Sequence, residues 1–363
     1  MPSPHSPMQD LPSPTLLVSE DRTRRNIGRM ADRARRHGLA FCPHLKTHQS
    51  ARVSGWLRDA GATAASVTSL RMARAAAAWG WTDLTIAMPV NPNQFAELRE
   101  LAGRVRLTVF LVDADVARRL AAAVPEPLAY YVELDAGYGR SGVAIDDLAA
   151  VRRIVAAAGH HRWRGGYVHS GHTYDAAGPA DLTAVHQALL GRIATFRAAL
   201  GPEYAGLEIA VGDTPACSTQ EDFTGVTSLG PGNFVYYDLV QAELGSCRPE
   251  DIAVCAALPV VQTKPATGEV IVHGGWVQLG KDRMSNGDYG VAVPLTETGW
   301  RGGGGTGRVT KLSQEHGTLR LPPAWVADLR PGDFVGVLPV HACALVHGMR
   351  AVGPTRYLDD FGE

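Results

Sequence analysis

The sequence lacks the features that mark several common classes of protein. Its five cysteines are scattered without a Cys-x-x-Cys pair, and an odd count in a chain of 363 residues argues against a disulfide framework. The 35 basic and 36 acidic residues give a formal net charge of -1, so charge gives no reason to expect a nucleic acid or an anionic membrane as partner. No apolar run approaches the roughly 20 residues that span a bilayer. We therefore expect a globular protein of a reducing compartment.

The first 14 residues also lack a targeting pattern. They are rich in proline and serine and contain no basic start followed by an apolar run, so we expect no signal peptide and a cytoplasmic location. Hydrophobic residues make up 45% of the sequence, and this length suffices for a large core divided between two domains.

Short apolar runs alternate with helical patterns from residue 15 to residue 211. The expected strands are 15–18, 38–41, 62–68, 84–90, 105–112, 130–134, 166–169 and 207–211. About eight such units over roughly 230 residues have the size of a closed (β/α)8 barrel. An open doubly wound sheet is the competing fold, but no Gly-x-Gly-x-x-Gly turn follows the first strand.

The pattern changes at about residue 242. The remaining sequence consists of short β-like runs with turn residues between them, which indicates a mostly antiparallel β-domain. The expected fold class is α/β: a TIM-like barrel over residues 15–241, followed by a β-domain over residues 242–363 to which residues 1–14 are joined.

The most informative stretch follows the second expected strand. A turn signal at Pro43 is followed by Lys46, which is flanked by His44 and His48. A lysine here has two interpretations. It is either a surface cation that ends a strand, which is the commoner case, or a partly desolvated amine near other cations, whose lowered pKa lets it form a Schiff base with an aldehyde.

A family resemblance favours the second interpretation. The segment Pro43-His44-x-Lys46-Thr47-His48 resembles the Pro-His-x-Lys-Thr-His motif of the D-serine dehydratase and D-threonine aldolase family, whose barrel is similar to that of alanine racemase. The resemblance extends from about residue 14 to the C-terminus. It implies an alanine racemase-like barrel in which Lys46 binds pyridoxal 5'-phosphate, and it implies a homodimer.

Polar and glycine-rich segments follow later strands, and by themselves they read as turns. The glycine turns 212–215 and 230–233 are candidate phosphate cradles, because barrels commonly place phosphates after their last strands. These turns and the segments 135–142 and 171–174 are similar to family segments. The resemblance implies that His172 is a candidate acid or base and that the following residues contact the cofactor: Arg140, Tyr174, Thr214, Gly232, Asn233 and Tyr236.

His341 and Cys343 form a candidate metal pair. On an extended strand, residues two apart point the same way, so both side chains can reach one ion. An imidazole with a thiolate suits zinc, and two protein ligands leave positions open for water or substrate. By itself, a His-x-Cys pair is more often a packed cysteine beside a histidine.

The resemblance reverses that preference. D-serine dehydratases of this family carry a zinc-binding Pro-Asn-His-x-Cys segment, whereas the aldolases more often have His-x-Asp. This chain has Cys343, although Val340 replaces the asparagine. The segment 313–317 is similar to the family's Ser-Glu-Glu-His-Gly with Gln314 as its one departure, and it makes His316 a second candidate base.

We therefore expect a pyridoxal-phosphate- and metal-dependent lyase that removes water from a D-3-hydroxy amino acid to give a 2-oxo acid and ammonia. Lys46 would hold the cofactor and take the α-proton, and a divalent metal, zinc in preference to manganese or magnesium, would stabilise the departing hydroxide. One alternative is a retro-aldol cleavage to glycine and an aldehyde, with His172 or His316 as base. Others are a non-catalytic pyridoxal-phosphate carrier and a racemase.

Overall fold

The computed structural model describes residues 8, 10–301 and 307–358. Contacts divide the chain into two compact units. The barrel unit consists of residues 27–232, and the β-unit combines residues 1–26 with 233–363. Helix α1 (Glu20–Arg36) begins in the β-unit and ends in the barrel unit. The expected domain bounds, 15–241 and 242–363, stay a prediction.

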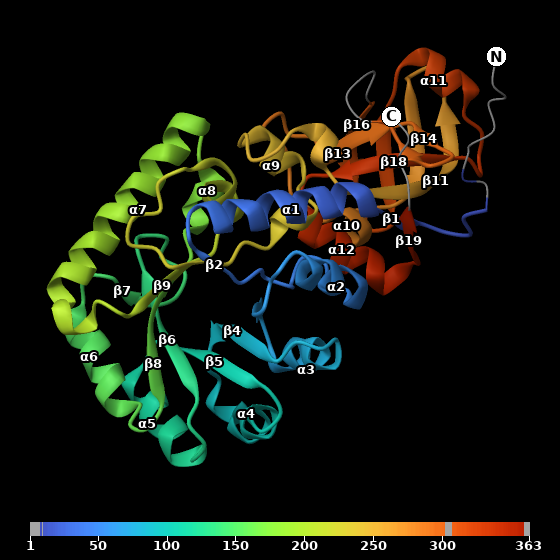
Figure 1. The fold of residues 1–363 in the computed structure, drawn as a ribbon. Coiled ribbons are helices and arrows are strands. Elements are labelled where there is room, and N and C mark those ends of the chain that lie inside the picture. Colours follow the sequence, from blue (N-terminus) through green and yellow to red (C-terminus); the bar gives the residue numbers. More distant parts are fainter. Residues whose placement is uncertain (1–7, 9, 302–306, 359–363) are drawn as a thin grey trace. The chain divides into compact units, whose positions relative to one another are not determined.

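The barrel unit contains a cylinder of eight parallel strands (Figure 1). In sheet order they are β2 (Ala40–Phe41), β10 (Ser228–Leu229), β9 (Glu208–Val211), β8 (Arg162–Val168), β6 (Ala129–Asp135), β5 (Arg106–Leu111), β4 (Asp83–Pro89) and β3 (Ala65–Val67). A parallel bridge between His44 and Ser66 closes the circle from β2 to β3, and the short β7 (Val143–Ala144) pairs with β6. The expected TIM-like barrel is confirmed.

Helices alternate with these strands along the chain. They are α2 (Ala51–Asp59), α3 (Leu70–Ala78), α4 (Phe95–Ala102), α5 (Ala114–Ala123), α6 (Leu148–Ala157), α7 (Pro179–Leu200) and α8 (Thr214–Thr219), with short 3-10 turns η1 (Pro92–Gln94), η2 (Gly171–Asp175) and η3 (Pro202–Tyr204). Five of them begin after a serine or aspartate whose side chain accepts a backbone N–H of the first turn, which stabilises that end. These cap residues are Ser50, Ser69, Asp113, Asp147 and Asp213.

Aromatic side chains fill the inside of the barrel. Phe110, Tyr131, Tyr167 and Ala210 form one buried cluster, in which the rings of Phe110 and Tyr167 lie 4.5 Å apart. The interior is therefore a packed core rather than a channel, and ligands must bind at a mouth of the barrel.

The β-unit contains a closed antiparallel barrel, which confirms the expected β-domain. Its strands, in order, are β12 (Glu269–His273), β17 (His316–Arg320), β16 (Gly307–Leu312), β13 (Gly290–Val293), β18 (Phe334–Pro339) and β11 (Val254–Lys264), and β11 pairs back with β12. Next to β11 lie β1 (Thr15–Ser19) and β19 (Thr355–Leu358), and β14 (Leu295–Thr296) pairs with β15 (Gly299–Trp300). The short helices are η4 (Asn233–Val235), α9 (Leu239–Glu243), η5 (Pro249–Asp251), α10 (Trp276–Leu279), α11 (Pro323–Asp328) and α12 (Ala342–Val352).

Two strands differ from the sequence-based expectation. Residues 15–18 were expected to begin the parallel barrel, but β1 is fully buried in the other sheet, antiparallel to β11. The eighth barrel strand is β10, which has only two residues and carried no recognisable apolar run. A short apolar run predicts a buried strand but not the sheet in which it pairs.

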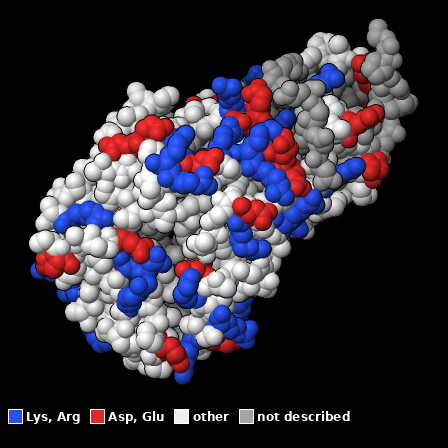
Figure 2. All heavy atoms as spheres, in the orientation of Figure 1, with Lys and Arg blue, Asp and Glu red and all other residues white. Residues whose placement is uncertain are grey.

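Charge is mixed on the visible surface. On the face drawn in Figure 2, basic and acidic side chains are interspersed, as the net charge of -1 suggests. No helix in the described part of the chain has both the length and the apolar character needed to cross a membrane.

Candidate active site

Lys46 lies at the carboxyl end of the barrel, just beyond β2. The backbone of residues 42–45 continues the strand pairing, since Cys42 N–H donates to the carbonyl of Leu229 and Leu45 N–H donates to that of Ser66. The chain then turns, and Gln49 adopts a φ of 45°. Lys46 is partly buried, at the end of the barrel where such folds place their active sites.

Two histidines near Lys46 are held neutral. Burial lowers the pKa of His169 to about 4, assisted by the positive charges of Arg140 and Lys46. Burial also lowers the pKa of His44 well below its usual value, with Lys46, His169 and Arg140 contributing. These side chains lie up to more than 120 residues apart in sequence and yet share one electrostatic environment. Lys46 and Arg140 supply its positive charge.

Arg140 extends from a loop that glycine makes possible. The carboxylate of Asp135, the last residue of β6, accepts the N–H groups of Gly137 and Gly139 at 2.9 and 3.1 Å. Both glycines have positive φ, 110° and 75°, and so does Gly142 at 107°. A Cβ on Gly142 would lie 3.0 Å from the backbone of β6. The loop can turn back along β6 only because that atom is missing.

The segment after β8 contacts the segment after β9. His169 Nδ1 is hydrogen-bonded to the carbonyl of Gly212, and the N–H of Thr214 donates to the Tyr174 hydroxyl at 3.2 Å. His172 is partly buried and its Nδ1 atom has no hydrogen-bond partner among the described residues. The structure thus brings together Tyr174 and Thr214, and His172 lies in the same turn η2 as Tyr174.

The two glycine turns lie side by side at the carboxyl ends of β9 and β10. A Cβ on Gly212 would collide with the Tyr167 hydroxyl and approach the Gly230 carbonyl to 3.2 Å, and one on Gly232 would lie 3.1 Å from the His44 Cβ. Only glycine therefore fits at these two positions. Two adjoining glycine turns at the carboxyl ends of the strands fit the phosphate of a pyridoxal cofactor.

The predicted residues beyond Gly232 belong to the β-unit. Asn233 Nδ2 donates to the Asp238 carboxylate at 2.5 Å, and Tyr236 is 1% exposed, with burial raising its pKa far above the usual value. Their assignment to the cofactor stays a prediction.

His341 and Cys343 meet at a turn rather than on a strand. β18 ends at Pro339, His341 precedes the first residue of α12, and Cys343 lies in the first helical turn. The two side chains are hydrogen-bonded, and His341 Nδ1 lies 3.2 Å from Asp282 Oδ2. The expected extended geometry is wrong, but the strand-to-helix turn brings the two donors together by another route. An imidazole beside a thiol is a donor set that suits zinc.

Comparison with known proteins decides the family. Residues 18–238 match the model of the alanine racemase N-terminal domain, and residues 253–352 match that of a putative serine dehydratase domain. D-threo-3-hydroxyaspartate dehydratase from Delftia sp. (strain HT23) is 32% identical, over 93% of each chain. The chain belongs to the D-serine dehydratase family. Family members are pyridoxal-phosphate-dependent lyases with an alanine racemase-like fold, so the expected enzyme class is confirmed.

Other members of the family agree with this assignment. The D-serine dehydratase of Dictyostelium discoideum is 26% identical over 93% of this chain and 91% of its own. The solved structure of the Delftia enzyme superposes with a TM-score of 0.86 over 94% of this chain and 93% of that one, at 29% identity. A structure of its cysteine-to-alanine variant is described as metal-free. A D-threonine aldolase from Filomicrobium marinum shares the fold, with a TM-score of 0.78 at 24% identity, covering 94% of this chain and 91% of its own.

His316, the other candidate base, is exposed at the start of β17, opposite His273 of β12. Its role as a base stays a prediction. No group of three or more histidine, cysteine and acidic side chains able to hold one metal ion occurs in the described ranges.

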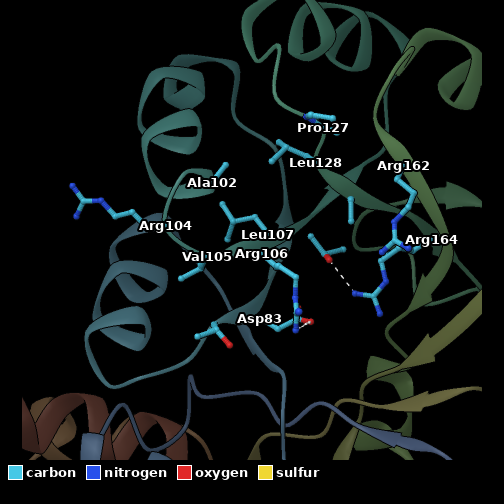
Figure 3. A pocket seen from close by; sticks show the side chains of 13 residues that line it. Asp83, Ala102, Arg104, Val105, Arg106, Leu107, Pro127, Leu128, Arg162 and Arg164 are labelled. Carbon is cyan, nitrogen blue, oxygen red and sulfur yellow. Dashed lines mark hydrogen bonds and ion pairs between the residues drawn. The ribbon is translucent and has the colours of Figure 1, made fainter.

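A hollow of about 780 Å³ opens at the opposite end of the barrel, at the amino ends of β4, β5, β6 and β8 (Figure 3). Its arginines are largely neutralised. Arg164 donates to both oxygens of Glu208 and to Thr108, and Arg106 pairs with Asp83 at 3.2 Å. Since barrel enzymes react at the carboxyl ends of their strands, this hollow is not the catalytic site.

Sequence reasoning missed the residues that hold the others in place. Glu133 is buried and accepts hydrogen bonds from the Ser141 hydroxyl, next to Arg140. Asp282 contacts His341 across 59 positions of sequence. Asp135 lies in the segment 135–142 that the sequence had singled out, whereas no local signal linked Asp282 to His341.

Proposed function

We propose that this enzyme removes water from a D-3-hydroxy amino acid and yields a 2-oxo acid and ammonia. The family supports the reaction class, and the cluster around Lys46 supports the cofactor. The observation that carries the choice of dehydration is the contact between His341 and Cys343, because the dehydratases of this family hold their metal with His-x-Cys.

The barrel unit fits pyridoxal 5'-phosphate. The Lys46 amine would hold the cofactor covalently through its aldehyde, the turns at Gly212 and Gly230 would bind the phosphate, and Arg140 would lie near the ring. When bound, the cofactor supplies an electron sink for the electrons left when the α-proton is removed.

The Lys46 amine, when it is not bonded to the cofactor, would take the α-proton as general base. His44 and His169 remain neutral at pH 7, because burial lowers the pKa of each. They therefore neither repel a cation on Lys46 nor compete with it as acids. Arg140 remains charged and can orient an anionic group.

The β-unit fits a divalent metal, which we assign as zinc. The Cys343 thiolate is a soft donor, which favours zinc over manganese or magnesium. Bound there, the metal supplies a Lewis acid for the β-hydroxyl as it departs with the C–O electron pair. The enamine that leaves the enzyme then takes up water to give the 2-oxo acid and ammonia. We further propose a small D-amino acid as substrate, a homodimer as the assembly and the cytoplasm as the location. The five cysteines are all free, which fits a reducing compartment.

The test measures products and cofactor together. Purified enzyme receives D-serine, D-threonine or D-threo-3-hydroxyaspartate, with and without chelator, and keto acid, ammonia, glycine and aldehyde are all assayed. We expect keto acid and ammonia in equal amounts, lost with chelator and restored by zinc. Glycine with an aldehyde would instead establish retro-aldol cleavage.

The Lys46→Ala variant tests the cofactor assignment. It should lose activity and the protein-bound cofactor absorbance, since no other amine takes its place. Lys264→Ala, which removes an exposed lysine paired with Glu269 of the β-unit, is the matched control and should retain both. An unchanged cofactor spectrum in Lys46→Ala would overturn the proposal.

A further inference from the structure

Two aspartates from distant parts of the β-unit contact the segment His341-Ala342-Cys343. Asp282 Oδ2 lies 3.2 Å from His341 Nδ1, and Asp238 Oδ2 accepts the N–H of Ala342 at 2.8 Å. Neither aspartate belongs to the His-x-Cys motif. Both approach the residues between which a metal would be held.

Asp282 determines which ring nitrogen of His341 is available. A carboxylate accepts a hydrogen bond, so Nδ1 must carry the proton that it donates to Asp282. With Nδ1 bonded to Asp282, Nε2 is the ring nitrogen left for a metal, and this is the arrangement that a metal-binding histidine needs. The contact therefore orients the His341 ring as an Nε2 ligand.

Close packing of two helices brings Asp282 to this position. Gly348 on α12 lies against the backbone of α10, since a Cβ there would collide with the Val277 carbonyl. The chain leaves α10 through Gly280, whose φ is 82°, and a Cβ on Gly280 would lie 3.0 Å from that of Ala344. Asp282 follows two residues later. Two glycines thus fix the loop that carries the carboxylate against the helix that begins after His341.

Asp238 holds the backbone between the two metal donors. It is 1% exposed and accepts three hydrogen bonds, from Asn233 Nδ2, Gln241 N–H and Ala342 N–H. The N–H of Val240 also donates to the carbonyl of Val340 at 3.3 Å. Asp238 therefore holds the backbone of the turn 340–343 on its buried side, and Asp282 holds the imidazole of His341.

We propose that Asp282 is a positioning residue for the metal. It fixes the tautomer and ring orientation of His341 and adds a negative charge beside the cation, without binding the ion itself. Asp282 contacts Nδ1, the ring nitrogen away from the one left for a metal, and this contact distinguishes it from a third ligand. The inference rests on the proposed metal site and goes beyond it by assigning the group that sets metal affinity.

The experiment measures zinc affinity and not only activity. Holoenzyme with its pyridoxal cofactor is stripped of metal, and zinc is titrated in competition with a chromophoric chelator. The proteins are wild type, D282A, D282N, D282E, H341A and D333N. Asp333 is the matched control, because its carboxylate accepts the Arg330 N–H at 2.7 Å in the same unit but contacts neither donor. Thermal melting of the metal-free proteins shows whether each variant is folded.

We expect D282A to bind zinc roughly 10–100-fold more weakly, as loss of such a carboxylate–histidine contact generally does. D282N keeps a hydrogen-bond acceptor but loses the negative charge, so its zinc affinity should lie between those of D282A and wild type. D282E should restore part of the affinity, and D333N should match wild type. The thiolate-to-metal absorption of the cobalt form should persist in D282A, because Cys343 still binds.

The outcomes separate this inference from the proposed function. Equal affinity of D282A and wild type would overturn the role of Asp282 while leaving the metal-dependent lyase intact. A loss in D282N as complete as in H341A would make Asp282 a ligand and overturn the positioning role. If wild type and H341A both bind no zinc, the metal site fails, and this inference fails with it.

Discussion

At the scale of single residues, burial decides which side chains near Lys46 carry charge. A histidine usually titrates near neutral pH, but His44 and His169 are desolvated close to Lys46 and Arg140. The sequence placed His44 beside Lys46 and could not show that His169, more than 120 residues later, lies in the same field. Neutral histidines are consistent with a site that keeps its positive charge for Arg140 and Lys46.

The depressed pKa of His169 predicts a dependence of stability on pH. In the unfolded chain this histidine takes up a proton near pH 6.5, whereas in the folded protein it does so only near pH 4. Its contribution is therefore fully present above pH 6.5 and is lost as the pH falls towards 4, because the unfolded state binds the proton first. The loss should be about 1–3 kcal/mol.

Urea unfolding of wild type and His169→Gln at pH 7.5, 5.5 and 4.5 measures this loss. The variant should lose less stability than wild type over the interval. His347→Gln, which replaces an exposed histidine of α12, should behave like wild type. Identical pH profiles for wild type and His169→Gln would contradict the assignment of the buried neutral state.

At the scale of elements, the loop from β6 to β7 shows how backbone conformation positions a functional side chain. Three glycines with positive φ flank Arg140, and Asp135 accepts the N–H groups of two of them. The sequence motif contained all of these residues. Their roles follow only from the return of the loop along β6, which leaves no space for a Cβ at Gly142.

We expect Gly142→Ala to destabilise the protein by about 1–3 kcal/mol, because alanine at a φ of 107° is strained and its Cβ meets the β6 backbone. Displacement of Arg140 should also weaken cofactor binding. Chemical unfolding and titration of the stripped enzyme with pyridoxal 5'-phosphate measure the two effects.

Gly28→Ala is the matched control. Gly28 lies within α1, and a Cβ there would meet no atom within 4 Å. This change should stabilise the protein by about 0.5–1 kcal/mol, since alanine loses less backbone entropy in a helix. If both variants changed stability in the same direction, backbone strain at Gly142 would not be the cause.

At the scale of the whole molecule, the order of segments along the chain does not tell which unit each segment joins. The β-unit is built from both ends of the chain, and β1 pairs with β11 and β19, which lie more than 230 residues away in sequence. Leu17 of β1 is fully buried in the cluster that also contains Ile252 and Leu338. The N-terminal strand is therefore part of the core of the β-unit.

Leu17→Ala should cost about 2–5 kcal/mol, as the loss of a buried leucine generally does. Under native conditions, hydrogen exchange should quicken first in β1, β11 and β19, while the barrel strands β5 and β6 keep their protection. Val261→Ala, which truncates a side chain that is 45% exposed on β11, should be nearly neutral. If hydrogen exchange in Leu17→Ala quickened first in β5 and β6, β1 would instead stabilise the parallel barrel.

The sequence alone determined the architecture of each unit, the lysine and the nearby motifs, because each of those signals lies within a few consecutive residues. It also singled out His341 and Cys343 as a candidate metal pair, which stays a prediction, although it expected them on a strand instead of at the start of α12. Only the tertiary structure decided that β1 leaves the parallel barrel and that the two-residue β10 completes it. It alone brought Asp282 to His341. Pairing between distant segments depends on which surfaces the whole chain can bury together, and local sequence patterns do not carry that information.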